Sequence, residues 1–428
     1  MESKKFLFVS IDALASDIAW RITQEGHEVK YFIEDAGEKD IADGFLTKVD
    51  DWKKEVEWAD IVVFDDVLGQ GKKAAELRKI GKLVVGGTPY TDRLEDDRAF
   101  GQEELKNAGI ATLSYRDFTS FDDALQFIRD NPDRYVLKPS GDTKNLKLFV
   151  GEEDDGRDLI QLLEAYKKAW TRKPPIFQLQ KRIIGVEVAV GAFFNGTDFV
   201  YPVNVNFEHK KLFPSDIGPF TGEMGTSMFW SDPNKIFNAT LKKMEGKLRE
   251  EHYVGYIDIN CIVNSNGIYP LEFTARFGYP TIYIQHAGML NPISEFLYEL
   301  AEGKMPKLKV KSGFQVGVRI VAPPFPFRDP KTFEINSKDT VIIFKKPTTD
   351  GIYFEDVKLV NGEWVIAGTT GAVLVAVGTG PTMKQARAQA YSRISNVIIP
   401  NMYYRDDIGE RWADDSDRLH TWGYLRES

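Results

Sequence analysis

The sequence has a single cysteine among its 428 residues. One thiol cannot form a disulfide within the chain, which excludes the class of small secreted domains held together by disulfides and favours a reducing compartment. The cysteine, Cys261, lies in an expected strand, where we interpret it as a small buried hydrophobic residue. The expected location is therefore the cytoplasm.

Long apolar runs and long basic runs are also missing. No apolar stretch approaches the length of a membrane-spanning helix. The short apolar run near the start is interrupted by Asp12, so we interpret it as a strand rather than a signal peptide. The formal net charge is -9, and without a basic stripe this argues against a protein that binds the nucleic-acid backbone. The length predicts about three domains.

Glycine is missing from the turn after the first expected strand. Strands are expected at residues 6–10, 27–33, 61–64 and 83–85, with helices at 15–24 and 72–80. This alternation predicts a parallel sheet that binds its ligand beyond the carboxyl ends of the strands. Those ends carry Asp12 and the pair Asp65 and Asp66. Their carboxylates would repel a phosphate and favour an amine or hydroxyl group, unless they only cap helices or face solvent.

The stretch 256–280 is expected to form two short strands joined by an Asn-Gly turn. Alternation puts Asp258 and Asn260 on one face of the first strand, and Glu272 and Thr274 on one face of the second. If these faces meet, their oxygen atoms suit Mg²⁺, which takes one or two carboxylates plus phosphate oxygens. The alternative is an edge hairpin with solvated charges.

A second set of residues points to a nucleotide. Lys138 ends a strand that begins at residue 135 and offers a point charge to a phosphate, and Lys144 lies in a possible lid. After another expected strand at 176–179, Ile183 suits the face of an adenine and Glu187 suits ribose hydroxyls. The alternative for each is an ordinary surface residue.

Residues 207–225 are expected to form a loop, because they contain three glycines. Glycine lets backbone amides approach a ligand closely and form an anion-binding concavity. We interpret His209 in this segment as a hydrogen-bonded structural residue rather than a general base.

The remaining pattern predicts helices and a C-terminal unit. Helices are expected at 91–108, 237–249, 293–300 and 383–397. Strands at 314–321, 341–344, 351–357 and 371–378 predict a separate β-rich unit after residue 306.

Several blocks occur in a fixed order along the chain. They are GGTPYTDRLEDDRAFGQEELKNAGIAT from Gly86, then Lys138, Gly185-x-Glu187, FEHKKLFPSDIGPFTGEMGT, LEFTARFG, VLVAVGTGPTMKQARAQAY and YYRDDIG. Together they resemble the ATP-grasp ligases, and most closely the glycinamide ribonucleotide synthetase (phosphoribosylamine–glycine ligase) family. The resemblance covers nearly the whole chain.

The resemblance implies an α/β and α+β multidomain fold. It implies an N-terminal α/β domain with a parallel sheet at 1–97, a central ATP-grasp module at 98–120 and 190–305, a lid subdomain at 121–189 and a small β-rich C-terminal domain at 306–428. The implied activity is an ATP-dependent, ADP-forming carboxylate–amine ligation through an acyl-phosphate, with glycine joined to an amine in a purine-nucleotide pathway. The implied partners are a small carboxylate and a small amine, with no nucleic acid or membrane, and the chain is expected to be a monomer or a homodimer.

The resemblance also assigns residues to roles. The ATP-binding residues are Arg98, Lys138, Lys144, Gln180, Ile183 and Glu187. The metal ligands are Asp258, Asn260, Glu272 and Thr274, with Mg²⁺ as the ion and Mn²⁺ as an alternative. The catalytic residues are Lys138, Arg276 for the acyl-phosphate, and Asp216 or Glu223 for the proton of the amine. The expected substrate-binding residues are His209, Lys210, Gly218, Thr221, Gly222 and Arg276 in the blocks of the resemblance, and Asp12 and Asp65 from their positions at the strand ends.

The sequence departs from the family pattern at several of these positions. Arg98 stands where the family has a lysine, and Thr274 replaces an asparagine ligand. The family's glycine-rich loop near the N-terminus is SIDALASDIAW here, and its Gly-Pro-Glu motif is Phe64-Asp65-Asp66. The lid motif Gly-Lys-Gly is Lys144-Asn145-Leu146. Two alternatives therefore stay open: a related ligase with a different amine in a specialised or nucleotide-modifying pathway, and a nucleotide-binding sensor without activity.

Overall fold

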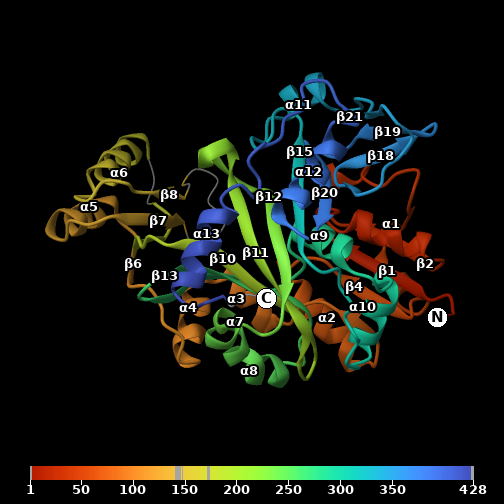
Figure 1. Ribbon diagram of the computed structural model, residues 1–428, viewed down its shortest axis with the longest axis horizontal. Coiled ribbons are helices and arrows are strands. Elements are labelled where there is room, and N and C mark those ends of the chain that lie inside the picture. The colour runs from red at the N-terminus through yellow and green to blue at the C-terminus, as the bar shows by residue number, and fades with distance from the viewer. Residues whose placement is uncertain (1, 140–145, 147, 171–173, 426–428) are drawn as a thin grey trace.

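The computed structural model describes residues 2–139, 146, 148–170 and 174–425 (Figure 1). Its N-terminal part is a five-stranded parallel sheet in the order β3-β2-β1-β4-β5, which confirms the predicted parallel sheet. The strands are β1 (Lys5–Ser10), β2 (Glu28–Ile33), β3 (Thr47–Lys48), β4 (Ile61–Phe64) and β5 (Leu83–Val85). The helical segments are α1 (Ser16–Gln24), η1 (Ala36–Glu38), η2 (Trp52–Glu55), α2 (Gln70–Lys79) and α3 (Pro89–Asp96). Asp12 and Asp65 follow the carboxyl ends of β1 and β4, so both lie at one edge of the sheet.

An eight-stranded antiparallel sheet forms the centre of the molecule, in the order β14-β13-β10-β11-β12-β15-β20-β17. Its strands are β10 (Val186–Asn195), β11 (Phe199–Phe213), β12 (Ile217–Ser231), β13 (Val254–Asn264), β14 (Gly267–Thr274), β15 (Phe314–Val321), β17 (Ile352–Phe354) and β20 (Ala372–Gly380). The helical segments around it are α4 (Arg98–Asn107), η3 (Pro214–Asp216), α7 (Lys235–Ala239), η4 (Leu241–Met244), α8 (Glu245–Glu250), α9 (Thr281–Gly288), α10 (Ile293–Ala301) and α13 (Trp412–Thr421).

The C-terminal region is β-rich, as predicted, but it has no main sheet of its own. Strand β15 pairs with β12 in a continuous register from Gly225–Val318 to Phe229–Phe314, and β20 and β17 follow. Composition does not reveal which strands pair, so the sequence did not show that these strands extend the central sheet. The other elements here are α11 (Pro330–Asn336), β16 (Ile343–Phe344), β18 (Val357–Val360), β19 (Glu363–Ile366), α12 (Met383–Ile394) and β21 (Val397–Ile398).

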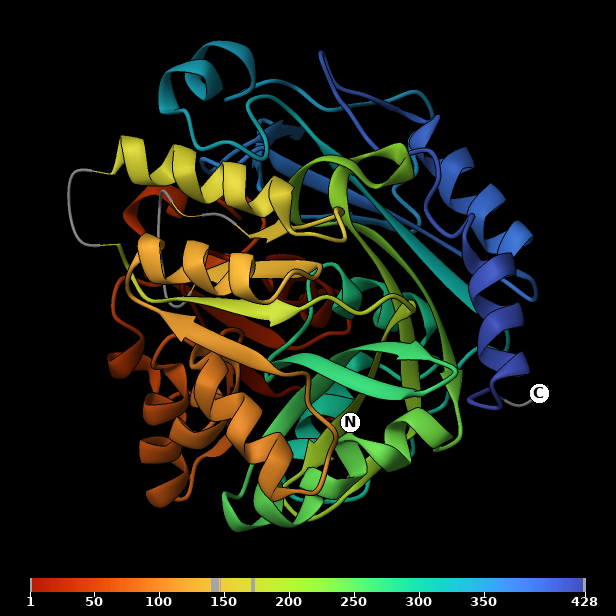
Figure 2. The same ribbon diagram turned by 90° about the vertical axis from the view of Figure 1, so that its left-hand side faces the viewer.

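A small four-stranded sheet projects from one side of the molecule, in the order β6-β9-β7-β8 (Figure 2). It comprises β6 (Tyr115–Phe118), β7 (Tyr135–Pro139), β8 (Phe149–Val150) and β9 (Phe177–Lys181), with α5 (Phe121–Asp130) and α6 (Arg157–Ala169) on one face. Leu137 and Leu179 pack against these helices in an apolar cluster. Because side chains alternate along a strand, Lys138, Gln178 and Gln180 point to the other face.

The structure corrects three expectations about individual elements. The helix expected at 91–108 is interrupted at Asp97, whose side chain accepts a hydrogen bond from the backbone N–H of Phe100 at 3.1 Å. The helix expected at 237–249 is interrupted at Thr240, whose hydroxyl donates to the carbonyl of Ile236 at 2.7 Å. The loop expected at 207–225 is mostly the paired strands β11 and β12. Glycine is needed there for packing, since a Cβ at Gly225 would lie 2.5 Å from a carbonyl oxygen of β15.

The apolar core is divided among these layers. One cluster joins β1, β2 and α1 with α9 and α10, and another lies between the central sheet and α7 and α8. The small sheet has its own cluster with α5 and α6, so it packs as a unit. None of the helices in the described part of the chain is both long and apolar enough to cross a membrane.

Candidate functional site

The hairpin of β13 and β14 brings the four predicted metal ligands to one face. In the register of the two strands, Asp258 lies opposite Thr274, and Asn260 lies opposite Glu272. Residues directly opposite each other point to the same face, as do residues two apart on one strand. The predicted convergence is therefore confirmed, although the turn residues are 265–266, one position earlier than the expected Asn-Gly pair.

Lys210 on β11 lies among three carboxylates of this face. Its Nζ is 3.1 Å from Glu272 Oε1, 3.3 Å from Glu208 Oε2 and 3.5 Å from Glu187 Oε1. Burial opposes the charge of the ammonium group, but the three carboxylates outweigh it and raise the pKa of Lys210 well above its usual value. Lys210 therefore carries a positive charge at neutral pH.

Two further cations lie near Glu272. Arg98 Nη1 is 3.5 Å from Glu272 Oε2, and Lys138 is close enough for its charge to act on the same carboxylate. Lys210, together with Arg98 and Lys138, lowers the pKa of Glu272 to about 2 against the effect of burial. Burial and the Arg98 guanidinium lower the pKa of Lys138 to about 8. Three cations around an ionised carboxylate form a centre that attracts a polyanion.

The residues on this face fit a Mg²⁺ ion. Asn260 Oδ1 is buried and has no hydrogen-bond partner among the described residues, while its Nδ2 donates to Glu208 Oε2 at 2.9 Å. Burial and the Glu208 charge raise the pKa of Asp258, so a cation beside these acids would be stabilised. In the described ranges, no group of three or more His, Cys, Asp and Glu side chains is arranged to hold a metal. An ion here would complete its shell with phosphate oxygens and water, as Mg²⁺ usually does.

The predicted nucleotide-binding residues lie between the small sheet and the hairpin. Gln180 of β9 is buried on the face of the small sheet that also carries Lys138 of β7, and its Nε2 has no hydrogen-bond partner within the described ranges. Ile183 is half-buried just before β10, and Glu187 lies in β10 and pairs with Lys210. The predicted lid residue, Lys144, lies outside the described residues.

Glu223 on β12 is buried next to a second charged pair. The hydroxyl of Thr226 donates a hydrogen bond to the carboxylate of Glu223. Arg319 pairs with Glu355 through contacts of 2.8 Å and 2.7 Å. Burial, followed by the Glu208 charge, raises the pKa of Glu223 well above its usual range. A buried carboxyl group with a raised pKa in a charged site is typical of proton-transfer residues.

The predicted substrate residues of β12 have different surroundings. Gly218 has a φ of 88°, and a Cβ there would lie 2.5 Å from the ring of Phe213. The hydroxyl of Thr221 donates to the carbonyl oxygen of Lys210 at 2.9 Å, which ties the two strands together. Gly222 has no neighbouring atom within 4 Å of an added Cβ. Packing therefore explains Gly218 but not Gly222.

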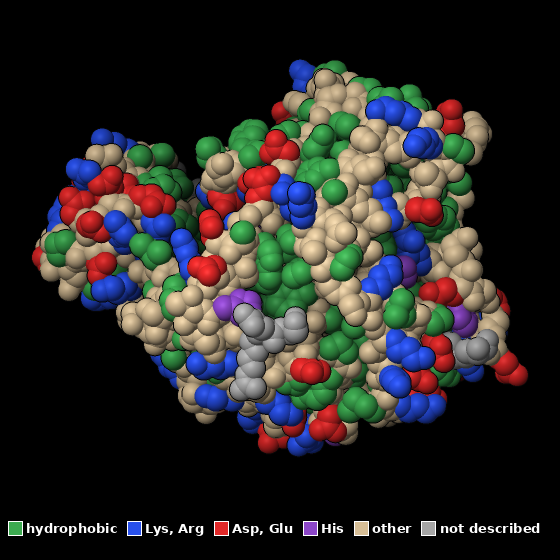
Figure 3. Space-filling model, in the orientation of Figure 1, with side chains coloured by type: hydrophobic (Ala, Val, Ile, Leu, Met, Phe, Trp, Pro, Cys, Tyr) green, Lys and Arg blue, Asp and Glu red, His purple; other side chains and the backbone are tan. Residues whose placement is uncertain are grey.

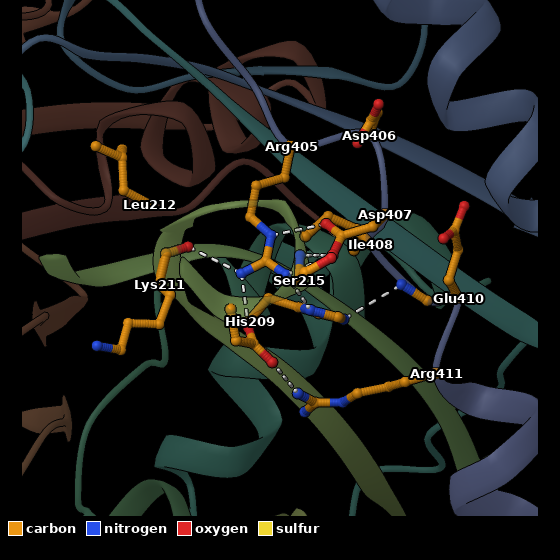
Figure 4. Close-up of polar contacts among 12 residues, drawn as sticks. His209, Lys211, Leu212, Ser215, Arg405, Asp406, Asp407, Ile408, Glu410 and Arg411 are labelled. Carbon is orange, nitrogen blue, oxygen red and sulfur yellow. Dashed lines mark hydrogen bonds and ion pairs between the residues drawn. The ribbon is translucent and has the colours of Figure 1, made fainter. Parts of the chain in front are cut away.

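The segment after β21 holds the β11–β12 hairpin through Arg405 (Figure 4). Arg405 is fully buried, and its Nη1 is 2.7 Å from Asp216 Oδ1. Its Nη2 is 2.7 Å from Asp407 Oδ2 and 3.2 Å from His209 Nδ1. Asp216, predicted as an acceptor of the amine proton, is therefore held in an ion pair with the C-terminal segment.

His209 lies in the same cluster. Burial and the charges of Arg411 and Arg405 keep the pKa of His209 well below its usual range, so the imidazole is neutral. The backbone N–H of Gly409 lies 3.3 Å from His209 Nε2. The interpretation of His209 as a hydrogen-bonded structural residue is confirmed, and its contact with substrate stays a prediction.

Arg276 joins the hairpin to the edge of the N-terminal sheet. Its Nε is 3.0 Å from Glu95 Oε1 and 3.1 Å from Asp66 Oδ1. Burial opposes its charge, but Glu95 and Asp66 raise the pKa of Arg276 above its usual value. Burial raises the pKa of Asp65 to about 7, and burial and the Asp66 charge raise the pKa of Asp12. The three carboxyl groups of Asp12, Asp65 and Asp66 therefore lie close enough together at this edge for the Asp66 charge to raise the pKa of the other two.

Sequence reasoning gave no role to several residues that complete this site. Glu208 and Glu95 contact Lys210 and Arg276, and the buried residues Arg319 and Arg405 support β12 and β11. The position of Glu208 could have indicated its role, because a strand at residues 207–213 would place Glu208 and Lys210 on the same face. No such indication existed for Glu95, since its contact with Arg276 joins elements 181 positions apart.

The comparisons with known proteins agree with this geometry. The family described as "Phosphoribosylglycinamide synthetase, ATP-grasp (A) domain" matches residues 96–282, and the corresponding "C domain" matches residues 315–411. The phosphoribosylamine–glycine ligase of Streptococcus pneumoniae is 25% identical over 360 residues, which cover 81% of this chain and 82% of that protein.

Solved structures show the same fold. The phosphoribosylamine–glycine ligase of Thermotoga maritima matches with a TM-score of 0.69 and 22% identity, over 94% of this chain and 100% of that chain. The biotin carboxylase domain of Hydrogenobacter thermophilus 2-oxoglutarate carboxylase, solved with MgADP, matches with a TM-score of 0.63 and 14% identity, over 99% of each chain. The two family matches together cover more than half of the sequence. The chain therefore belongs to the phosphoribosylglycinamide synthetase family of ATP-grasp proteins.

Proposed function

We propose that this protein is an ATP-dependent, ADP-forming ligase that joins a carboxylate to an amine through an acyl-phosphate. The main support for the proposal is that three cations, Lys138, Arg98 and Lys210, lie beside Glu272 on the acidic face of the β13–β14 hairpin. Phosphoryl transfer needs positioned substrates and neutralised charge more than a covalent nucleophile, and this arrangement supplies both. The relatives named above as phosphoribosylamine–glycine ligases support the same reaction class. We place the reaction in the cytoplasm.

In the first step, a carboxylate of the substrate attacks the γ-phosphorus of ATP and ADP leaves. Lys138, Arg98 and Lys210 would hold the triphosphate, and Gln180, Ile183 and Glu187 would hold the nucleoside. Asp258, Asn260, Glu272 and Thr274 would hold Mg²⁺, with Mn²⁺ as an alternative, and the ion would offset charge on the phosphate oxygens. Support for a nucleotide and magnesium comes from the related fold solved with MgADP.

In the second step, the amine attacks the acyl carbon, phosphate leaves and the amine loses a proton. Arg276 would steady the acyl-phosphate, because it is the guanidinium held at this edge by Glu95 and Asp66. Glu223 would accept the proton. Its carboxyl group is buried beside the charged cluster and forms no ion pair among the described residues, whereas Asp216 is paired with Arg405.

The proposed function is tested by ADP release in a coupled assay, with phosphoribosylamine and glycine as the first pair of substrates. We expect ADP release that requires both a carboxylate and an amine and yields one amide per ADP. The absence of turnover with every pair tested, together with tight ATP binding, would instead support a nucleotide-binding sensor.

A different amine is the second candidate, and one feature of the N-terminal edge favours it. The turn after β1 has no glycine, and it carries Asp12. The negative charges of Asp66 and Asp35 raise the pKa of Asp12, and the positive charge of Arg328 lowers it. An amine that lacks a phosphate group would meet less repulsion at this edge. Amide formation with glycine and a cationic amine, but not with phosphoribosylamine, would establish this candidate.

A further inference from the structure

A cavity of about 250 Å³ lies at the C-terminal end of α9, apart from the site described above. Its lining includes His286, Lys311, Tyr353, Thr379 and Arg393. Helix α9 begins shortly after Arg276 and rises about 1.5 Å per residue, so its two ends are roughly 10 Å apart. None of the residues assigned to the ATP-grasp site lines the cavity.

Two cations face this cavity without a carboxylate partner. Neither Lys311 nor Arg393 forms an ion pair with any described residue, and no Asp or Glu lines the cavity. Asp350 acts on the charge of Arg393 from beyond ion-pair distance. Burial and the Arg393 charge lower the pKa of Lys311, which shows that the two cations are close enough to repel each other. Two partly buried cations that repel each other are costly to hold together unless an anion joins them.

Both cations keep free donors. Lys311 Nζ donates to the carbonyl oxygen of Ala287 at 2.7 Å, and the guanidinium of Arg393 donates to the carbonyl oxygen of Val377. An ammonium group has three donors and a guanidinium has five, so most of them remain available. The bond to Ala287 caps α9, which explains one donor of Lys311 but not the presence of Arg393 beside it.

Neutral polar groups and a glycine complete the lining. Tyr353 Oη lies 2.8 Å from His286 Nδ1, and the guanidinium of Arg21 lies 4.0 Å from the centre of the Tyr353 ring. Burial and the Arg21 charge lower the pKa of His286 to about 3, so the imidazole is neutral. A Cβ at Gly351 would lie 2.2 Å from Arg393 Nη1, so glycine is what admits the guanidinium to the cavity.

Figure 3 shows several Lys and Arg side chains on the part of the surface where α1 and α9 lie in Figure 1. The volume is near the lower end of the range for small-molecule sites, about 300 Å³, so the ligand must be compact. We propose that this cavity is a second anion site, in which Lys311 and Arg393 bind the phosphate group of free phosphate or of a small phosphomonoester. A tetrahedral, doubly charged oxyanion matches two cations and the hydroxyl groups of Tyr353 and Thr379.

The test is isothermal titration calorimetry of the whole protein with inorganic phosphate and, separately, with glycerol 3-phosphate. The ATP-grasp site is first filled with Mg²⁺ and a non-hydrolysable ATP analogue, so that phosphate cannot bind there. The variants are Lys311→Gln and Arg393→Gln, and the control is Lys309→Gln, an exposed lysine of the same segment that does not line the cavity. We expect each cavity variant to weaken binding by at least about tenfold and the control to leave it unchanged.

The two ligands distinguish the source of the phosphate group: tighter binding of glycerol 3-phosphate identifies an organic phosphate, and equal or tighter binding of phosphate identifies the free ion. No heat from either ligand at millimolar concentration, or equal binding by the wild type and both variants, would overturn the proposal. If Arg393→Gln does not fold, the comparison of phosphate binding between Lys311→Gln and the wild type decides whether the proposal holds. A second readout is the imidazole NMR signal of His286, one of five histidines, which we expect to shift with phosphate in the wild type and not in Lys311→Gln.

Discussion

Lys210 and Glu272 are 62 positions apart in the sequence, and they form a hydrogen-bonded ion pair of 3.1 Å between Nζ and Oε1. The pair spans the sheet from β11 to β14, across the two strands β10 and β13 that lie between them. Because Lys210 is the main cause of the low pKa of Glu272, the carboxylate is ionised before any nucleotide binds. The proposed phosphate-binding cation and the proposed metal ligand therefore form one preorganised unit.

The first prediction concerns Glu272. The variant Glu272→Gln keeps the size of the side chain but removes the charge that Lys210, Arg98 and the proposed metal share. We expect kcat for ADP formation to fall by about a hundredfold or more, because the charge is needed where phosphoryl transfer occurs. The measurement is steady-state ADP release, with circular dichroism as the check of folding. ADP release at the wild-type rate from a folded variant would contradict the assignment of Glu272.

The second prediction concerns Lys138. Replacing it by Gln removes a buried cation that faces Glu272. We expect KM for ATP to rise by about tenfold or more, as for the loss of a charge-assisted contact to phosphate. The matched control is Lys181→Gln, an exposed lysine at the end of β9 that pairs with Asp133, and its KM should not change. Equal effects of the two variants would exclude a specific contact of Lys138 with ATP.

The third prediction concerns Arg405. The variant Arg405→Met leaves Asp216 and Asp407 without their shared cation. We expect the free energy of unfolding to fall by about 3 kcal/mol, the range for removing one partner of a buried ion pair. Urea unfolding measures this loss.

Two further variants serve as controls for Arg405. Arg405→Lys keeps the charge but not the planar fork, so its loss should be intermediate. Arg129→Met breaks an exposed pair with Glu164 and should cost no more than about 1 kcal/mol. A loss for Arg405→Met as small as that for Arg129→Met would show that the C-terminal segment does not hold the β11–β12 hairpin.

The fourth prediction is a pH dependence that originates in Asp65. Burial raises the pKa of its carboxyl group from 3.8 to about 7, so between these values the folded protein keeps a proton that the unfolded chain has lost. The contribution of Asp65 to stability therefore falls as pH rises from about 4 to about 7 and is constant above that. A pKa shift of this size changes the contribution of Asp65 to the free energy of unfolding by at most about 4 kcal/mol over this pH range.

The variant Asp65→Asn tests this dependence, because an amide keeps the acceptor oxygen for the backbone N–H of Ala15 but does not titrate. We expect the difference in unfolding free energy between Asp65→Asn and the wild type to grow through this pH window, in favour of the variant. Urea unfolding at a series of pH values measures it. A difference that does not vary with pH would place the titration elsewhere.

The sequence alone was sufficient for features that depend on local pattern. Strands β1 and β4 of the N-terminal sheet are apolar runs, because they are buried on both faces. The acidic face of the hairpin follows from the two-residue period of its strands, which puts Asp258 and Asn260 on one face of β13, and Glu272 and Thr274 on one face of β14. The sequence blocks that occur in the same order as in the family were sufficient to predict the ATP-grasp fold.

Features that depend on contacts between distant segments could not be predicted. The pairing of β12 with β15 decides that the C-terminal region shares the central sheet, and no local pattern encodes it. The glycines at 218, 222 and 225 indicated a loop, although packing and main-chain pairing place them in a strand. Arg405 lies in the block YYRDDIG, but its role could not be predicted, because its partners Asp216 and His209 lie almost 200 positions away.

The continuous sheet from β14 to β17 restricts how this enzyme can open. Every strand from the hairpin to the C-terminal region is joined to the next by main-chain hydrogen bonds, so the acidic face, Glu223 and Arg319 cannot swing relative to one another without breaking them. The chain enters the small sheet of β6 to β9 through residues 108–114 and leaves it through residues 182–185, and the sheet has its own apolar core. We therefore expect any opening of the proposed nucleotide site to rotate the small sheet about these two connections, which would carry Lys138 away from the acidic face of the hairpin.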